Sequence, residues 1–243
     1  MRNNRFFTSL IIILSGVLSV SCQCSVNSNG DEEKTSSSNI ILEEDFSSPL
    51  SPEHWQVEME GHGYGQSSVS VLEDQLVMDT KAGVTVWLKQ KLQGNLQITY
   101  KRQVVMEGGI NDRLSDLNQF WMASDPRNAD LFTRQGKFDE YDSLQMYYIG
   151  FGGNYNKTTR FRKYQGTGEK TLLFDLEDKE HLLAPNHWYT ITIRVKDGLI
   201  TFQVDGETFF SYQDEQVLKE GYFGFRSTWS RHRIDDLQIV KLD

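Results

Sequence analysis

The sequence predicts an all-β protein built as a sandwich of two antiparallel sheets. From Ile40 onward, short runs alternate between apolar and polar residues, as strands with one buried face do. In the run Thr190–Val195, Ile191 and Ile193 point to one side and Thr192 points to the other. About a dozen such runs suit one sandwich domain.

Turn residues separate these runs. Lys196-Asp197-Gly198 and Asp205-Gly206 join three of them, and Asp-Gly between alternating runs is a strong hairpin signal. Helical turns are expected only in 127–135 and 176–181. The predicted strands include 67–71, 75–79, 84–88, 96–105, 187–195, 199–204, 207–212, 222–226 and 234–242.

The composition excludes several classes of protein. Hydrophobic residues make up 38% and charged residues 24%, which excludes a multispan membrane protein, and 12% aromatics exclude a disordered chain. A net charge of −9 argues against nucleic acid as a partner.

The 2 cysteines, Cys22 and Cys24, precede the predicted domain, so a disulfide or a cysteine-ligated metal is not expected in it. The histidines lack zinc-site spacing.

The N-terminus predicts export. In residues 1–21, Arg2 and Arg5 precede an apolar stretch too short to span a membrane. The ending Leu18-Ser19-Val20-Ser21-Cys22 resembles a lipobox, which implies a lipidated Cys22. The alternative is an ordinary signal peptide cut near Ser21. We therefore expect a lipoprotein anchored in the cell envelope, at the outer membrane or its periplasmic face.

Residues 22–39 are polar and predict a flexible tether, followed by one folded domain over 40–243. The acidic run Asp31-Glu32-Glu33 resembles the surface-export signal of Bacteroidetes lipoproteins. The alternative interpretation of this run is a solvated spacer.

The two ends of the folded domain resemble a known fold. Residues 44–46, Trp55 and 73–78 look like the opening of concanavalin A-like jelly rolls from carbohydrate-active proteins. Residues 220–226 and 234–239 are similar to the last strands of those proteins. The resemblance implies a concanavalin A-like jelly-roll sandwich.

A narrower resemblance covers residues 111–242. The segments 111–123 and 159–164 look like a bacterial jelly-roll family of largely unassigned function. Its relatives commonly occur with systems that degrade pectin and rhamnogalacturonan. The resemblance implies association with a polysaccharide and brings no mechanism with it.

Jelly rolls bind glycans across one concave sheet, so the alternation along a strand predicts its binding face. In 142–151, Leu144, Met146 and Tyr148 suit the core, which leaves Gln145 and Tyr147 on the binding face.

Over 117–123 the alternation is ambiguous. We favour Gln119 and Trp121 on the binding face, because Phe120 and Met122 would pack well in the core. This choice places Asn118 in the core, where it needs a polar partner.

Cationic residues form three groups. Arg113 stands alone; Arg160, Arg162 and Lys163 make a second group; and Arg226 with 231–233 makes a third. Such groups in an acidic chain point to an acidic ligand, because arginine can fork onto a carboxylate with two hydrogen bonds. The alternative is that they decorate strand edges and oppose aggregation.

A uronate polymer as ligand makes β-elimination by a polysaccharide lyase the preferred function. That reaction needs a neutraliser of the carboxylate, a base and an acid. Arg113, Asn118 or Gln119 are the candidate neutralisers, Tyr147 is the candidate base or acid, and His232 is its candidate partner. The arrangement is similar in kind to alginate-lyase jelly rolls, although Tyr147 stands where their histidine would be. The predicted substrate-binding residues are Asn118, Gln119, Trp121, Gln145, Arg160, Arg162, Arg226 and Trp229.

Two alternatives remain. One is a glycan-binding lipoprotein without catalysis, with Trp121 and Trp229 as stacking platforms. The other is a hydrolase of a modified oligosaccharide. A retaining glycosidase is disfavoured, because 139–142 lacks the Glu-x-Asp-x-x-Glu spacing of jelly-roll glucanases.

Acidic residues gather where the first and last strands are expected to pair. Related jelly rolls hold a structural Ca²⁺ in such a place, so the resemblance implies a Ca²⁺ site with Glu44 and Asp236. The alternative is a group of solvated carboxylates. No other cofactor is expected.

Overall fold

The computed structural model describes residues 39–61 and 66–243, and its regular structure is almost entirely β-strand. The helical elements η3 (Phe138–Tyr141), α1 (Gly153–Asn156) and η4 (Lys179–His181) are short. The strands are β1 (Ile40–Glu44), β2 (Trp55–Met59), β3 (Ser68–Leu72), β4 (Gln75–Leu88), β5 (Leu92–Gln93), β6 (Leu96–Val104), β7 (Leu117–Ser124), β8 (Gln145–Gly152), β9 (Thr158–Gln165), β10 (Lys170–Leu176), β11 (Trp188–Lys196), β12 (Leu199–Val204), β13 (Glu207–Gln213) and β14 (Glu220–Lys241).

The all-β prediction is confirmed, and these strands pair antiparallel. Two pairs of predicted strands are each one long strand, β4 and β14. The helical turn expected in 176–181 is present as η4, whereas the one expected in 127–135 is absent and that segment is irregular. The predicted leader and nearly all of the tether lie outside the described residues. Within the described ranges, no helix is long and apolar enough to cross a membrane.

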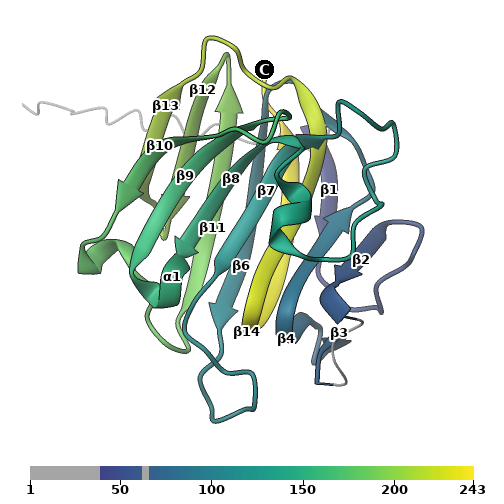
Figure 1. The fold of residues 1–243 in the computed structure, drawn as a ribbon, viewed down its shortest axis with the longest axis vertical. Helices are drawn as coiled ribbons and strands as arrows, with labels where there is room; N and C mark the ends of the chain where they lie inside the picture. The colour runs from purple at the N-terminus through teal and green to yellow at the C-terminus, as the bar shows by residue number, and fades with distance from the viewer. Residues whose placement is uncertain (1–38, 62–65) are drawn as a thin grey trace, which may run out of the picture. The chain divides into compact units, whose positions relative to one another are not determined.

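The 22-residue strand β14 joins the two layers of the sandwich. Its residues 222–226 pair with β7, and its residues 232–241 pair with β6. The strand order is therefore β10-β9-β8-β7-β14-β6-β11-β12-β13, with β4 along the other edge of β14. We call β7–β10 with 222–226 the first layer, and β6 and β11–β13 with 232–241 the second layer. The first layer lies in front of the second in Figure 1.

The main hydrophobic core lies between the layers. Phe161 of β9 and Phe210 of β13 are buried with their ring centroids 5.9 Å apart, and Phe151 of β8 and Tyr189 of β11 are 5.0 Å apart. Burial of each such side chain stabilises the fold by about 1.5–3 kcal/mol. The second layer follows the predicted alternation, since Ile191, Ile193 and Val195 point into this core.

A second apolar cluster covers part of the outer face of the first layer, the side turned away from the second layer. The segment 125–144, which joins β7 to β8, folds over Trp87 and Phe120. The ring of Tyr141 lies 5.3 Å from that of Phe120 and 6.0 Å from that of Trp87. The first layer is thus buried on both sides where this segment, the cover segment, lies.

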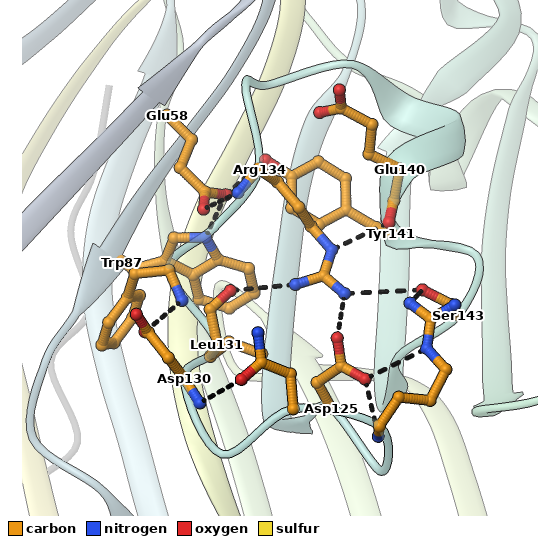
Figure 2. Close-up of polar contacts among 12 residues, drawn as sticks. Glu58, Trp87, Asp125, Asp130, Leu131, Arg134, Glu140, Tyr141 and Ser143 are labelled. Atoms are coloured by element: carbon orange, nitrogen blue, oxygen red, sulfur yellow. Dashed lines mark hydrogen bonds and ion pairs between the residues drawn. The ribbon is translucent and has the colours of Figure 1, made fainter.

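Arg134 and Glu58 hold the cover segment in place (Figure 2). The Arg134 side chain donates hydrogen bonds to the carbonyls of Leu131 and Glu140 and pairs with Asp125. Glu58 of β2 accepts from the Arg134 backbone amide at 2.9 Å, from Trp87 Nε1 at 2.8 Å and from the Tyr141 hydroxyl at 2.7 Å. Burial raises the pKa of Glu58, and these donors oppose the rise.

Arg102 of β6 lies fully buried where β14 leaves β7 and turns to β6. Its Nη1 donates to the carbonyl of Asn118 at 2.8 Å, and its Nη2 donates to the carbonyl of Arg226 at 3.0 Å. Its Nε donates to Nδ1 of His232 at 3.2 Å. Burial lowers the pKa of Arg102 to about 10, so the side chain stays charged near neutral pH. One guanidinium therefore binds the backbone of both β7 and β14. We call the point where β14 leaves β7 and turns to β6 the fork.

We expect Arg102→Met to lower the free energy of unfolding by about 3–5 kcal/mol, because it leaves buried acceptors without donors. Urea denaturation measures this loss. The matched control is Lys101→Met on the neighbouring residue, which is half-exposed and pairs with Asp236. The control should cost less than about 1 kcal/mol. Equal losses in the two variants would show that the fork does not depend on Arg102.

Candidate functional site

Directly paired residues of an antiparallel sheet point to the same face, so the strand register defines rows across the first layer. The row with Phe225, Gln119, Ile149 and Phe161 faces the core. The adjacent row therefore faces outward. It contains Thr85, Arg226, Asn118, Gly150 and Arg160, in that order across β4, β14, β7, β8 and β9.

Gly150 is the point in this row where two neighbouring polar groups meet. A Cβ on Gly150 would lie 2.3 Å from the Tyr148 hydroxyl and 3.0 Å from Asn118 Oδ1. A larger residue would therefore displace both groups. The Tyr148 side chain lies in the next outward row, between Phe120 and Arg162.

Three guanidinium groups surround Tyr148. Burial raises the pKa of Tyr148 above its ordinary value, and the charge of Asp116 raises it further. The positive charges of Arg162, Arg226 and Arg160 act in the opposite direction. The phenol is accordingly protonated at neutral pH, in a strongly cationic setting.

Arg226 lies under the edge of the cover segment. Its Nη1 donates to the carbonyl of Gly136 at 2.5 Å, and its guanidinium carbon lies 5.5 Å from the ring of Phe138. Arg226 Nε and Asn118 Oδ1 are buried and lack a hydrogen-bond partner among the described residues. Buried polar groups without a partner are uncommon in proteins, so these two atoms are a notable feature of this face. We call Asn118, Tyr148, Arg160, Arg162 and Arg226 the arginine surface, in which Arg160 and Arg162 are half-buried and the other three residues are buried.

Arg113 and Trp229 lie beside the arginine surface. Arg113 pairs with Asp116, and Asn118 Nδ2 donates to Asp116 Oδ1 at 3.4 Å. Trp229 is 39% exposed, and the Arg113 guanidinium carbon lies 5.4 Å from its ring centroid. The structure thus brings four arginines of the three predicted groups, Arg113, Arg160, Arg162 and Arg226, to one face.

The other predicted cations lie elsewhere. Arg231 pairs with Asp112, Arg233 pairs with Glu73, and Lys163 pairs with the buried Asp214. Lys163 shares the inward parity of Phe161 on β9, whereas Arg160 and Arg162 point outward.

The prediction that Tyr147 faces the binding surface is wrong. Tyr147 is fully buried between the layers, where its hydroxyl donates to Asp214 Oδ2 at 2.6 Å. Burial raises its pKa, and Asp214 adds to the rise. Alternation along β8 predicts correctly that Tyr147 and Tyr148 point to opposite faces, but both faces are apolar, so it does not say which residue points inward. Tyr148 is the functional candidate that this assignment missed.

Other residues of β7 and β8 also lie on the face opposite to the predicted one. Trp121 is buried in the core between the layers and stacks on Tyr147 at 5.3 Å. Gln119 is buried there too, donating to the carbonyl of Ile149 and accepting from the Tyr100 hydroxyl. Gln145 shares the inward parity of Tyr147. Asn118, expected in the core, is instead on the outward row.

His232, the candidate catalytic partner, also lies in the interior rather than on the binding face. It is fully buried behind the arginine surface, accepting from Arg102 at Nδ1, and its Nε2 lies 2.9 Å from Ser227 Oγ. Burial, followed by the charges of Arg102 and Arg113, lowers its pKa well below 6.5. Neutral His232 with its proton on Nε2 satisfies both contacts.

The residues expected to hold Ca²⁺ do not fit a metal site. The carboxylate of Glu44 accepts from the Phe46 amide at 2.9 Å and from Trp55 Nε1 at 3.4 Å, and Asp236 pairs with Lys101. In the described part of the chain, no group of three or more histidine, cysteine or acidic residues is arranged to bind a metal.

A polar cavity of about 960 Å³ lies beside the cover segment. Most of its charged groups already have partners: Asp125 pairs with Arg127 and Arg134, Asp142 pairs with Lys170, and Glu140 accepts hydrogen bonds from backbone amides. These contacts stabilise the cover segment, so the arginine surface is the stronger candidate site.

The chain belongs to a family described as "Domain of unknown function (DUF6250)", which matches residues 78–237. No curated protein matches the chain.

Solved structures share the fold. A protein of unknown function with a galectin-like fold from Bacillus subtilis has 17% identity and a TM-score of 0.70, over 86% of this chain and 97% of that one. The carbohydrate-binding module CBM66 from B. subtilis has 9% identity and a TM-score of 0.53, over 77% and 96%. An endo-β-1,3-glucanase from Pyrococcus furiosus has 12% identity and a TM-score of 0.57, over 83% and 94%. The jelly-roll prediction is confirmed.

His232 makes the stability of the fold depend on pH. Because its pKa is lowered in the folded state, the unfolded chain binds the proton first as the pH falls below about 6.5. The free energy of unfolding should then fall by up to about 1.4 kcal/mol per pH unit until the folded-state pKa is reached. Urea denaturation between pH 7.5 and 5 measures this slope. His232→Asn keeps an acceptor for Arg102 without titrating, and a slope as steep as that of the wild type would contradict the assignment.

Proposed function

We propose that this protein is an exported, carbohydrate-active protein that binds an acidic, uronate-containing polysaccharide on its arginine surface. The observation that carries the proposal is the gathering of Arg160, Arg162 and Arg226 around Tyr148 and Asn118. The leader pattern supports export and lipid anchoring at the cell envelope.

The chemistry of the surface favours a carboxylate. Guanidinium groups bind carboxylates through paired hydrogen bonds, and here they gather in a chain of net charge −9. Asn118 Oδ1 is a buried acceptor without a partner beside these arginines. The fold that this chain shares with a carbohydrate-binding module and a glucanase supports a glycan as the ligand class. The narrower sequence resemblance favours a pectin or rhamnogalacturonan polymer.

We expect Arg160→Gln and Arg162→Gln each to weaken binding of acidic polysaccharide by roughly tenfold, since each removes one charged hydrogen-bonding partner. Affinity electrophoresis or calorimetry against rhamnogalacturonan, polygalacturonate, alginate and a neutral glucan measures this. Affinity should also fall as salt is raised.

The matched control is Arg233→Gln, which makes the same charge change where Arg233 pairs with Glu73. It should bind like the wild type. If all three variants bind equally well, or if the wild type binds the neutral glucan as tightly as the acidic polymers, the arginine surface is not the site.

β-elimination at the same surface is a second candidate, favoured by the protonated Tyr148 among the arginines. In this reaction a base takes the proton from the carbon bearing the carboxylate. A carbon–carbon double bond forms while the glycosidic C–O bond breaks, and a proton goes to the leaving oxygen. The arginines would neutralise the carboxylate, Tyr148 would give the proton, and Asp116 is a neighbouring carboxylate suited to take one.

A hydrolase has less support. The acidic residues at the ends of the outward row, Glu58 and Asp175, lie at opposite edges of the sheet. Glu58 is committed to the cover segment, and Asp175 pairs with Arg160. This differs from the pair of carboxylates about 5–9.5 Å apart that glycosidases use.

Ultraviolet absorbance of the unsaturated uronate tests the lyase candidate. A lyase should raise the absorbance on one acidic polymer, and Tyr148→Phe should abolish the rise while binding persists, because only the phenolic proton is lost. The wild type raising no absorbance on any bound polymer would exclude β-elimination and leave glycan binding alone. A Tyr148→Phe variant with full activity would reject Tyr148 as the acid.

A further inference from the structure

An aromatic corner adjoins the arginine surface. The guanidinium carbon of Arg113 lies 4.9 Å from the ring centroid of Tyr155 and 5.4 Å from that of Trp229. Both rings face solvent, since Tyr155 is 62% exposed and Trp229 is 39% exposed. Lys81 lies 4.7 Å from the ring of Trp229, so Tyr155 is the more open of the two rings.

The backbone at this corner is strained. Tyr155, Trp229 and Asp116 have φ angles of 59°, 43° and 62°, a left-handed region that is unfavourable for residues with a side chain. All three contact Arg113. Elsewhere the bulky left-handed residues Phe46 and Met122 are buried, where packing fixes their conformation. Tyr155 and Trp229 are exposed, so contact with Arg113 rather than burial holds them, and strained residues of this kind are frequent at functional sites.

The charge of Arg113 is not available to a ligand. Its Nε donates to the carbonyl of Trp229 at 2.6 Å, and its Nη2 contacts Asp116 and the carbonyl of Thr228. Arg113 therefore orders the rings rather than forking onto a carboxylate. What the corner offers is aromatic surface, which suits the apolar C–H face of a sugar ring.

The corner is continuous with the arginine surface. Asp116 pairs with Arg113 on one side and accepts from Asn118 Nδ2 on the other. Asp116 therefore places the aromatic corner next to Asn118 of the arginine surface.

We propose that the aromatic corner is a second sugar subsite, which stacks an uncharged pyranose ring neighbouring the uronate held by the arginine surface. This inference rests on the proposed function, because it places the second sugar relative to the first. The preferred ligand is then an alternating chain of acidic and neutral sugars rather than a homopolymer of uronate.

The experiment compares two oligosaccharides of equal charge, an oligogalacturonate and an alternating galacturonate–rhamnose oligomer. Tyr155→Ala should weaken binding of the alternating oligomer on the order of tenfold and leave that of oligogalacturonate within about twofold. Tyr155→Gly should weaken binding of the alternating oligomer as much as Tyr155→Ala does. It should also raise Tm by a few degrees, because glycine adopts the left-handed conformation without strain. Asp74→Gly is the control: Asp74 has a φ of 56° in the β3–β4 turn, and its replacement should not change binding.

The outcomes separate the two proposals. Loss of binding in Arg160→Gln together with unchanged affinity in Tyr155→Ala would overturn the aromatic subsite and keep the arginine surface. Equal losses for both oligomers in Tyr155→Ala would overturn the preference for a neutral neighbour. Wild-type protein that binds neither oligomer would overturn the proposed function itself. An unchanged Tm in Tyr155→Gly would show that the corner is not strained.

Discussion

The buried guanidinium of Arg102 is the interaction on which the rest of the structure depends. It lies where β14 exchanges β7 for β6, and it donates to the carbonyls of Asn118 and Arg226, the residue pair at the end of the β7–β14 ladder. A buried peptide carbonyl without a donor lowers the free energy of unfolding. Where β14 passes from one layer to the other, such carbonyls therefore need a donor from elsewhere. A side chain with several fixed donors does so for both strands at once.

This constraint also sets the geometry of the arginine surface. Asn118 and Arg226 are held through their carbonyls from inside the sandwich, while their side chains point outward. The backbone of both residues is therefore fixed by Arg102, which limits how far their side chains can move. The same buried charge acts on His232 and favours its neutral form, so the network behind the surface contains one cation rather than two.

The sequence predicted the second layer well and the faces of the first layer poorly. In β11 one face is apolar and the other is polar, so Ile191 and Ile193 could be placed without ambiguity. In β8 the residues on both faces are apolar or aromatic, because the cover segment buries the outer face that would otherwise meet water. Alternation then gives relative orientation without saying which side is inward. No local pattern marks residues 125–144 as a cover, since they are irregular and depend on Arg134 and Glu58 for their shape.

Charged residues gave a firmer guide than aromatic ones. Arg160 and Arg162 flank Phe161 on β9, and a buried Phe161 forces both arginines outward. Whether arginines from separate segments share one face cannot be predicted from the sequence, because it depends on the strand register that places Arg226, Asn118 and Arg160 in one row. Tyr147 and His232 carry groups suited to acid–base chemistry, but both lie in the interior, where each has a buried polar partner: Asp214 for Tyr147, and Arg102 for His232.

The division of the outer face into a covered half and a charged half has a physical cause. The cover segment lies on Trp87 and Phe120, the apolar part of the face, and stops at Arg226. At that edge Gly83 is required, since a Cβ there would lie 2.2 Å from the carbonyl of Gly136 and 2.7 Å from Arg226 Nη2. The Gly136 carbonyl thus approaches both the sheet and the guanidinium. Arg226 therefore binds the cover segment through this carbonyl at the edge of the arginine surface, so one side chain of the sheet fixes where the covered half ends.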